Sequence, residues 1–489
     1  MLFDTHWREF RLFEGKPERV SYDNVRVAVD RVVLWKARRA SRRLFVSSKN
    51  TKTNETSLGV ERMNVHELIE RNRNGESIGL PSFCTANQHV LEATLGFAAE
   101  NELPVLIEAT CNQVNQEGGY TGMKPADFAS WVARLASHAG VKTDQLLLGG
   151  DHLGPNPWRD EPVAAAMRKA EMLVRSYVEA GFQKIHLDAS MACDGEPRPS
   201  FSDIAQRAAH LCRIAEDYAP DPSKLIYVIG SEVPVPGGET DDMQDLQITT
   251  PERLDETVQT HEAAFRKEGL EGAWERVVSV VTQPGVDFSH SSVHQFDPAA
   301  AVDLVAAIDR HPRLTFEGHS TDYQPTSSLA QLVERHVFFL KVGPELTFRF
   351  REAVFALAAI EDRVCPKTVS GIIGVLDEAM DNAPAHWDGY YAGTPADIAL
   401  QRHFSFSDRI RYYWQEAPVR DAVDRLLNNL VAADVPNGLV TQVFGGLEFD
   451  ETSGDIRTLL DTHVCKAVSR YYAACGLAPP PSSDRKPTR

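Results

Sequence analysis

Two polar residues, Asp151 and His152, come directly after the apolar run at 146–150. An imidazole is a good ligand for zinc and similar divalent ions, and a neighbouring carboxylate can exchange a proton with a substrate. The pair therefore has the residue types of a metal-assisted acid–base site. The alternative interpretation is a histidine that only hydrogen-bonds the backbone where a strand ends.

Most of the other apolar runs of the chain also end in residues that can do chemistry. A loop cap or a solvated charge would explain any one of these residues, but not so many of them at equivalent positions. The polar residues at or just after the ends of the runs include Asn87, Glu108, Asn112, Asp188, Glu232, Gln283, Glu317, His319, Ser320 and Lys341.

The elements that must position these residues alternate between two patterns. Eight short apolar runs, spaced by roughly 25 to 50 residues, have the continuous hydrophobicity of buried parallel strands. Helical periodicity lies between them, as at 162–180, and the alternation predicts a (β/α)8 TIM barrel with its site at the carboxyl ends of the strands. An open doubly wound sheet is the alternative, but no GxGxxG motif follows the first run. The eight runs are 78–84, 105–109, 146–150, 184–189, 225–230, 277–282, 314–318 and 338–342.

The character of the chain changes outside the barrel region at 63–350. Residues 1–62 hold 14 Lys and Arg against 8 Asp and Glu, so the rest of the chain carries a charge of −24. We interpret this basic stretch as a poorly ordered extension, with Met63 as a candidate start of translation. Residues 351–476 have helical periodicity and are expected to pack on the barrel as additional helices, and a proline-rich disordered tail follows at 477–489.

Composition narrows the class of protein. The 489 residues are 43% hydrophobic, and no run approaches the roughly 20 apolar residues of a membrane span. An acidic body with a net charge of −18 is poorly suited to binding nucleic acid or an anionic membrane surface. Seven cysteines without a CxxC pair suit a reducing compartment. We therefore expect a cytoplasmic protein that handles a small molecule.

Several segments in order along the chain resemble the family of tagatose-bisphosphate aldolase non-catalytic subunits. This family includes ketose 6-phosphate 4-epimerases, and some of its members are named tagatose 6-phosphate kinases. The resemblance covers about 63–476, and residues 1–62 have no counterpart in it. The similar segments are 79–87, 107–113, 118–123, 149–155, 229–234, 316–323, 341–344 and 404–414.

The resemblance implies roles for the Asp-His pair, because class II ketose-bisphosphate aldolases carry such a pair at a strand end. Carried over, His152 would bind a divalent metal, zinc or similar, and Asp151 would exchange the proton of the C4 hydroxyl. Catalytic zinc usually takes three protein ligands. We expect Glu232 and His319 to be the other two. Glu317 and His294 are rivals for these places, and the sixth run ends without the histidine that a three-histidine aldolase set would need.

Two functions follow from the resemblance. One is a metal-dependent epimerase that interconverts D-tagatose 6-phosphate and D-fructose 6-phosphate by cleaving and re-forming the C3–C4 bond. Asp151 would serve one face of the substrate and Glu108 or Asp188 the other. The alternative is an accessory subunit that stabilises a separate class II tagatose-1,6-bisphosphate aldolase, its partner.

The substrate would be a small sugar phosphate. We expect Asn112 to contact it, and Ser320, Lys341 and the backbone of Gly343 to lie near its phosphate; Lys341 could instead be a residue of the barrel interior with a buried partner. No GxxxxGK[ST] loop or glycine-rich nucleotide motif is present, so a kinase is not supported.

Overall fold

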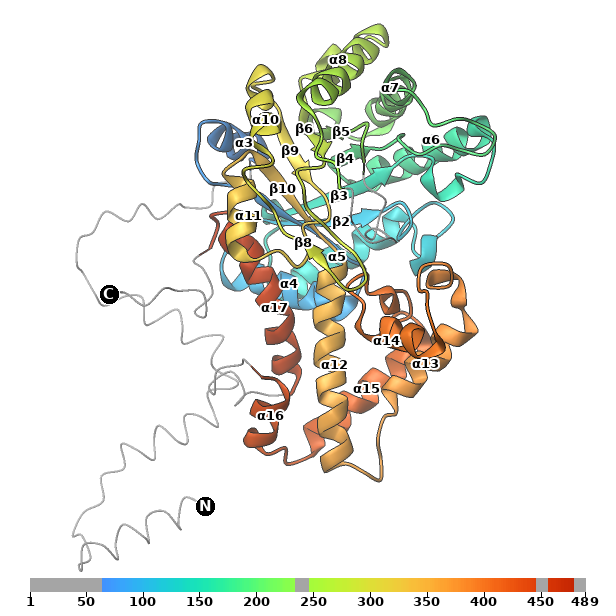
Figure 1. Cartoon of the computed structure of the whole chain (residues 1–489), viewed down its shortest axis with the longest axis vertical. Coiled ribbons are helices and arrows are strands. Elements are labelled where there is room, and N and C mark those ends of the chain that lie inside the picture. Colours follow the sequence, from blue (N-terminus) through green and yellow to red (C-terminus); the bar gives the residue numbers. More distant parts are fainter. Residues whose placement is uncertain (1–63, 234–245, 446–455, 479–489) are drawn as a thin grey trace, which may run out of the picture. The chain divides into compact units, whose positions relative to one another are not determined.

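A computed structural model describes residues 64–233, 246–445 and 456–478 of the chain (Figure 1). The basic extension expected at 1–62, and the tail expected at 477–489 apart from its first two residues, lie outside the described residues. Within the described ranges, no helix combines the length and apolar character that crossing a membrane requires.

The centre of the fold is a closed barrel of eight parallel strands, in the order β1-β10-β9-β6-β5-β4-β3-β2. This confirms the predicted (β/α)8 TIM barrel, and each predicted apolar run overlaps one barrel strand. Almost every residue of these strands is buried, because one face contacts the barrel interior and the other the surrounding helices. The strands are β1 (Leu80–Cys84), β2 (Val105–Thr110), β3 (Leu146–Leu153), β4 (Lys184–Leu187), β5 (Ile226–Ile229), β6 (Val277–Thr282), β9 (Thr315–Gly318) and β10 (Val337–Val342).

Amphipathic helices follow the strands and bury their apolar faces against the barrel. Helix α6 (Val163–Glu179) shows the pattern, with Ala166, Ala170, Leu173 and Tyr177 buried at helical spacing. The other helices of this part are α3 (Val65–Arg73), α4 (Gln88–Glu100), α5 (Pro125–Ala139), α7 (Phe201–Tyr218), α8 (Pro251–Lys267), α9 (Glu271–Trp274), α10 (Val302–Ala307) and α11 (Thr326–Val333).

A short antiparallel hairpin of β7 (Asp287–Phe288) and β8 (Val293–His294) leaves the barrel after β6. Strand β3 is longer than predicted, so Asp151 and His152 belong to its last residues instead of following it. Its register shifts between Gly150 and Leu153, and His152 has a positive φ of 50°. This irregularity redirects the His152 side chain at the mouth of the barrel.

The helical region follows the last barrel strand without a break. Helix α12 (Pro344–Val364) begins directly after β10 and spans the boundary expected at residue 350. Helix α17 (Ile456–Ala474) lies beside α12 in Figure 1 and also packs against α4 and α11, so the C-terminal region is attached to the barrel wall. The remaining helices are α13 (Ile372–Asn382), α14 (Pro395–Phe404), α15 (Ala417–Ala432) and α16 (Asn437–Val443).

A buried ion pair fixes the segment between α14 and α15 to the barrel. Arg351 of α12 donates from Nε to Asp408 Oδ1 at 2.9 Å, and Thr347 donates to Asp408 Oδ2 at 2.6 Å. Asp408 has a positive φ of 45° and precedes the short 3-10 helix η8 (Arg409–Tyr412). Because both partners of the ion pair are buried, we expect η8 to hold one position against the first turn of α12.

Candidate active site

A pocket opens at the carboxyl ends of the barrel strands, where the polar residues were expected to meet. Residues of β1, β2, β3 and β10, and residues that follow these strands and β9, line it together with η8 and the residues after η8. The polar residues and the glycine that line it include Asn112, Asp151, His152, His319, Ser320, Asp322, Lys341, Gly343, Arg411, Tyr412 and Gln415.

Three imidazoles lie together at the base of this mouth. The ring centroids of His152 and His319 are 5.0 Å apart, those of His152 and His186 are 5.2 Å apart, and those of His186 and His319 are 5.3 Å apart. The rings come from the ends of β3, β4 and β9, which are not all neighbours in the barrel. Convergence of strand ends on the barrel axis brings them together.

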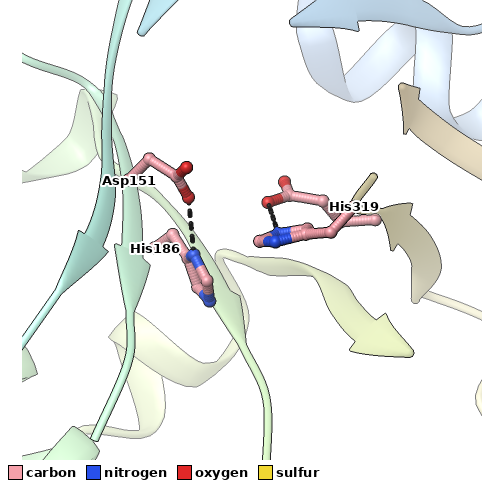
Figure 2. Close-up of side chains that lie close together, drawn as sticks. Asp151, His186 and His319 are labelled. Carbon is pink, nitrogen blue, oxygen red and sulfur yellow. Dashed lines mark hydrogen bonds and ion pairs between the residues drawn. The ribbon is translucent and has the colours of Figure 1, made fainter. Parts of the chain in front are cut away.

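Each imidazole has a carboxylate beside one of its ring nitrogens. His152 Nδ1 is 2.8 Å from Asp188 Oδ2, and His186 Nδ1 is 2.8 Å from Asp151 Oδ1. His319 Nε2 lies 3.0 Å from Glu317 Oε1. Figure 2 shows Asp151 against His186, with His319 approaching from the other side. Carboxylates in this position fix the tautomer of metal-ligating histidines and leave the other nitrogen for the ion.

The arrangement fits a divalent ion. One ligand atom each from Asp151, His186, Glu317 and His319 lies within 4.8 Å of all the others, and the four residues are buried. The Nε2 atom of His186 is buried and has no hydrogen-bond partner among the residues that the structure describes. A buried polar atom without a partner is costly, and a metal bond would satisfy it. His152 lies next to this group, with its Nε2 atom 3.6 Å from Asp151 Oδ2.

A network of buried charges lies under the imidazoles. Lys184 Nζ is 2.6 Å from both Glu108 Oε1 and Glu317 Oε2, and all three side chains have no exposed surface. Lys341 Nζ pairs with Glu108 and lies 2.6 Å from Asp151 Oδ2. The polar side chains replace the aliphatic layers that usually fill such a barrel.

Gly149 makes room for this network. A Cβ atom at residue 149 would lie only 2.6 Å from Glu108 Oε1. The glycine of β3 therefore allows the Glu108 carboxylate to cross the barrel interior toward the two lysines.

The charges set the protonation states of the cluster. Burial alone would raise the pKa of Asp151, but His152 and Lys341 outweigh it and hold this pKa well below its usual value. Burial lowers the pKa of His319 to about 4, so its imidazole is neutral near pH 7. Burial would lower the pKa of His152 too, but Asp151 and Asp188 raise it. Asp151 and His319 are therefore in the forms that bind metal, an ionised carboxylate and a neutral imidazole, whereas the raised pKa of His152 favours its protonated form.

Asp322 is the second carboxylate of the pocket, and its role in the fold is to cap α12. Its Oδ1 accepts hydrogen bonds from the backbone N–H groups of Gly343 at 2.9 Å and Glu345 at 2.8 Å. Burial, and to a lesser degree the charge of Glu345, raise the pKa of Asp322 to about 7. The carboxyl therefore exists in both protonation states near neutral pH.

The structure brings some of the predicted metal ligands together and not others. His152 and His319 lie in the imidazole cluster, and the rival ligand Glu317 is beside them. Glu232 is not in this group, because its carboxylate pairs with Arg253 at 2.6 Å. His294 is exposed on the β7–β8 hairpin.

The predicted acid–base and substrate residues divide in the same way. Asp151, Asn112, Ser320 and Lys341 line the pocket. Glu108 and Asp188 do not appear among its lining residues; one is held between two lysines and the other supports His152. Gly343 also lines the pocket, but its N–H group is engaged by Asp322 and is not free for a phosphate.

His186, Asp322 and Arg411 belong to the site, but sequence reasoning assigned none of them a role there. A pattern could have revealed His186, because Lys184 and His186 alternate along β4 and must face the same side, and Asp188 continues this spacing just after the strand. Arg411 lies 69 residues beyond the last barrel strand. Its place at the pocket depends on how η8 packs, which strand periodicity does not reveal.

Comparisons with known proteins agree with the fold and cover most of the chain. A family model for "D-tagatose-1,6-bisphosphate aldolase subunit GatZ/KbaZ-like" matches residues 65–476. The chain is 46% identical over 417 residues to the D-tagatose-1,6-bisphosphate aldolase subunit GatZ of Klebsiella pneumoniae subsp. pneumoniae, covering 84% of this chain and 98% of that one. A solved structure, a probable tagatose 6 phosphate kinase from Sinorhizobium meliloti 1021, is 41% identical with a TM-score of 0.75, covering 81% of this chain and all of that one. The matches span the barrel and the C-terminal helices together.

Proposed function

Because the chain belongs to the GatZ/KbaZ-like family of D-tagatose-1,6-bisphosphate aldolase subunits, we propose that it acts on a ketose phosphate of this type, as a metal-dependent 4-epimerase. The reaction would interconvert D-tagatose 6-phosphate and D-fructose 6-phosphate. The observation that carries the proposal is the group of carboxylate-supported imidazoles beneath a polar pocket. A protein that served only as a scaffold would not need such a group.

The chemistry of the substrate favours a cleavage mechanism. In a 2-ketose, C4 is not adjacent to the carbonyl carbon, so simple enolisation cannot invert it. Removing the C4 hydroxyl proton allows the C3–C4 bond to break, with its electron pair moving toward the C2 carbonyl. The aldehyde that forms rotates and is attacked on its other face, and the proton returns to the C4 oxygen. Atoms and electrons balance, and no other reactant is needed.

His186, His319 and Glu317 are our candidates to hold the divalent ion, with Asp151 or His152 completing the set. When bound, the ion supplies Lewis-acid polarisation of the C2 carbonyl and stabilises the negative charge released by C3–C4 cleavage. The low pKa of His319 supports this assignment, because a neutral imidazole can give its lone pair to a metal without first losing a proton. The Nε2 atom of His186 supports it as well, because it has no hydrogen-bond partner among the described residues.

Asp151 is the candidate base for the C4 hydroxyl. It lines the pocket, and its low pKa keeps it in the ionised form that a base requires. Hydrogen bonding to His186 and the ion pair with Lys341 fix the position of its carboxylate.

For the opposite face we propose Asp322 in place of Glu108 or Asp188. A carboxyl group must reach the substrate to exchange a proton with it, and among the described residues the carboxylates lining the pocket are Asp151 and Asp322. The pKa of about 7 suits a group that both gives and takes a proton near neutral pH.

The test is NMR of the full chain with D-tagatose 6-phosphate, with and without a divalent metal. We expect fructose 6-phosphate only when metal is present, and a rate at least about 100-fold lower in Asp151→Asn, which is the contribution typical of a general base. Asp160→Asn, at an exposed residue beyond β3, is the matched control and should keep the wild-type rate. No turnover with any divalent metal would contradict the proposal.

A second function has its own support, because the relative with 46% identity is named an aldolase subunit. In this role the chain would stabilise a class II tagatose-bisphosphate aldolase by binding it. Co-expression with such an aldolase, followed by measurement of its half-life at 37 °C, tests this role directly. Asp151→Asn separates the two functions: it should lower the rate of epimerisation at least about 100-fold and leave any stabilisation of the partner unchanged.

A further inference from the structure

The cationic side chains at the pocket differ in how their charge is balanced. Lys341 is paired with two carboxylates, those of Glu108 and Asp151, so little of its charge remains for a ligand. Arg411 also lines the pocket, but within the described residues no carboxylate oxygen lies within ion-pair distance of its guanidinium. The nearest carboxylate in sequence, that of Asp408, is held by Arg351.

Neutral groups hold the Arg411 guanidinium in place. Nη1 donates to the backbone carbonyls of Ser407 and Asp408, and Nη2 donates to the Tyr412 hydroxyl at 2.9 Å. An arginine carries five N–H donors, so these contacts orient the group without using all of them. They also leave its positive charge intact.

The segment that carries Arg411 is bound to the barrel loops. Gln415 donates from Nε2 to the backbone carbonyl of Ala86 after β1, and the Tyr412 ring packs edge-on against Tyr120 at 4.6 Å. The Arg351–Asp408 ion pair holds the other end of the segment. Arg411 is thus fixed relative to the barrel strands that carry the imidazoles, although it belongs to the helical region.

A side chain of the protein already occupies the position where such barrels usually bind phosphate. Phosphates commonly bind backbone N–H groups after the last strands, at a helix N-terminus. Here the N-terminus of α12 lies in that position, and the Asp322 carboxylate accepts from Gly343 and Glu345. An anion of the substrate must therefore be bound elsewhere in the pocket.

We propose that Arg411 is the residue that recognises the phosphate ester of the substrate, so that the C-terminal helical region completes the binding site of the barrel. This inference rests on the proposed function for the identity of the sugar. Guanidinium groups bind phosphate through parallel charge-assisted hydrogen bonds, which neutral ligands cannot replace. Arg411 therefore determines preference for phosphorylated over unphosphorylated ketoses.

Isothermal titration calorimetry of the full chain tests this with D-tagatose 6-phosphate, D-tagatose and inorganic phosphate. Both epimers carry the same phosphate, so turnover during the titration does not alter the contact. In Arg411→Gln we expect the Kd for tagatose 6-phosphate to rise about 30-fold and that for tagatose to stay unchanged. Arg411→Lys keeps the positive charge but not the paired N–H donors of the guanidinium, so its Kd for tagatose 6-phosphate should rise about 5-fold. Arg420→Gln, at an exposed arginine of α15, is the control and should bind as wild type.

Three results would overturn the inference. The first is unchanged binding of tagatose 6-phosphate by Arg411→Gln. The second is an equal loss of affinity for tagatose, which would mean that Arg411 supports the pocket and not the phosphate. The third is a wild-type chain that binds neither tagatose 6-phosphate nor inorganic phosphate.

Binding of the phosphate and epimerisation of the sugar are tested by separate measurements. If the wild type binds tagatose 6-phosphate through Arg411 but does not epimerise it, the epimerase proposal fails and the phosphate contact stands. Thermal unfolding of each variant shows whether it folds. If Arg411→Gln does not fold, the Kd of Arg411→Lys is the deciding measurement. A Kd for the phosphate ester in Arg411→Lys equal to that of wild type would then count against the inference.

Discussion

Because Lys184 belongs to the network of buried charges under the site, we expect Lys184→Met to lower the free energy of unfolding. Lys184 Nζ is 2.6 Å from a carboxylate oxygen of Glu108 and another of Glu317, and none of the three side chains is exposed. Methionine fills a similar volume, so the main effect is the loss of charge. Glu108 would keep its ion pair with Lys341. Among the described residues, Glu317 would keep no cation at ion-pair distance: His319 beside it is neutral because burial lowers its pKa to about 4, and the charge of Lys341 acts on it only from farther away.

Leaving a buried carboxylate without a cation costs about 3–5 kcal/mol. We therefore expect the free energy of unfolding of Lys184→Met to fall by that amount. Urea denaturation followed by circular dichroism, in the absence of added metal, measures it. Lys224→Met is the matched control: this lysine is exposed and pairs with Asp221 at 3.2 Å, so its loss should cost less than about 1 kcal/mol.

A double variant isolates the cause. Adding Glu317→Gln to Lys184→Met removes the carboxylate that has no cation, and most of the lost stability should return. The reasoning is refuted if Lys184→Met costs no more than Lys224→Met, or if the double variant is no more stable than Lys184→Met alone.

Three further predictions concern the pocket and its support. Asp322 has a folded pKa of about 7, raised above its unfolded value, so its contribution to stability is complete below about pH 4 and is lost as pH rises toward 7; the wild type should lose about 2–3 kcal/mol relative to Asp322→Asn between pH 5 and pH 8 in urea denaturation. His186→Ala should weaken binding of zinc or cobalt at least about 100-fold by calorimetry, whereas His261→Ala, at a buried histidine of α8, should not; equal affinities would remove His186 from the ligand set. Gly149→Ala should cost about 1–3 kcal/mol, because the added methyl group displaces Glu108; a midpoint of denaturation equal to that of the wild type would contradict the close contact.

Much of the fold could be predicted from the chain itself. Each apolar run is continuous because a strand in a parallel barrel is buried on both faces, so the eight strands stand out from the amphipathic segments between them. The position of the site follows as well, since the polar residues come at the strand ends, and these ends converge in any such barrel. His152 and His319 could be chosen as partners on that basis, although they lie 167 residues apart in the chain.

Which residues meet within that mouth was decided by the tertiary structure. Glu232 comes at the end of a barrel strand as His319 does, but it pairs with Arg253 instead of entering the cluster. His186 enters because alternation along β4 turns it inward together with Lys184. A strand end fixes how close a residue is to the axis. It does not fix which neighbour the side chain binds, because that depends on pairs formed between strands.

The sequence by itself determined the barrel, the mouth and the types of chemical group available there. Only the tertiary structure decided that Glu108 is buried between two lysines, that Asp322 occupies the N-terminus of α12, and that Arg411 reaches the pocket from the helical region. The physical reason is the range of the interactions. The periodicity of the sequence shows which residues of one helix or strand are buried. Ion pairs and caps join residues from distant elements, and they form only when those elements have packed together.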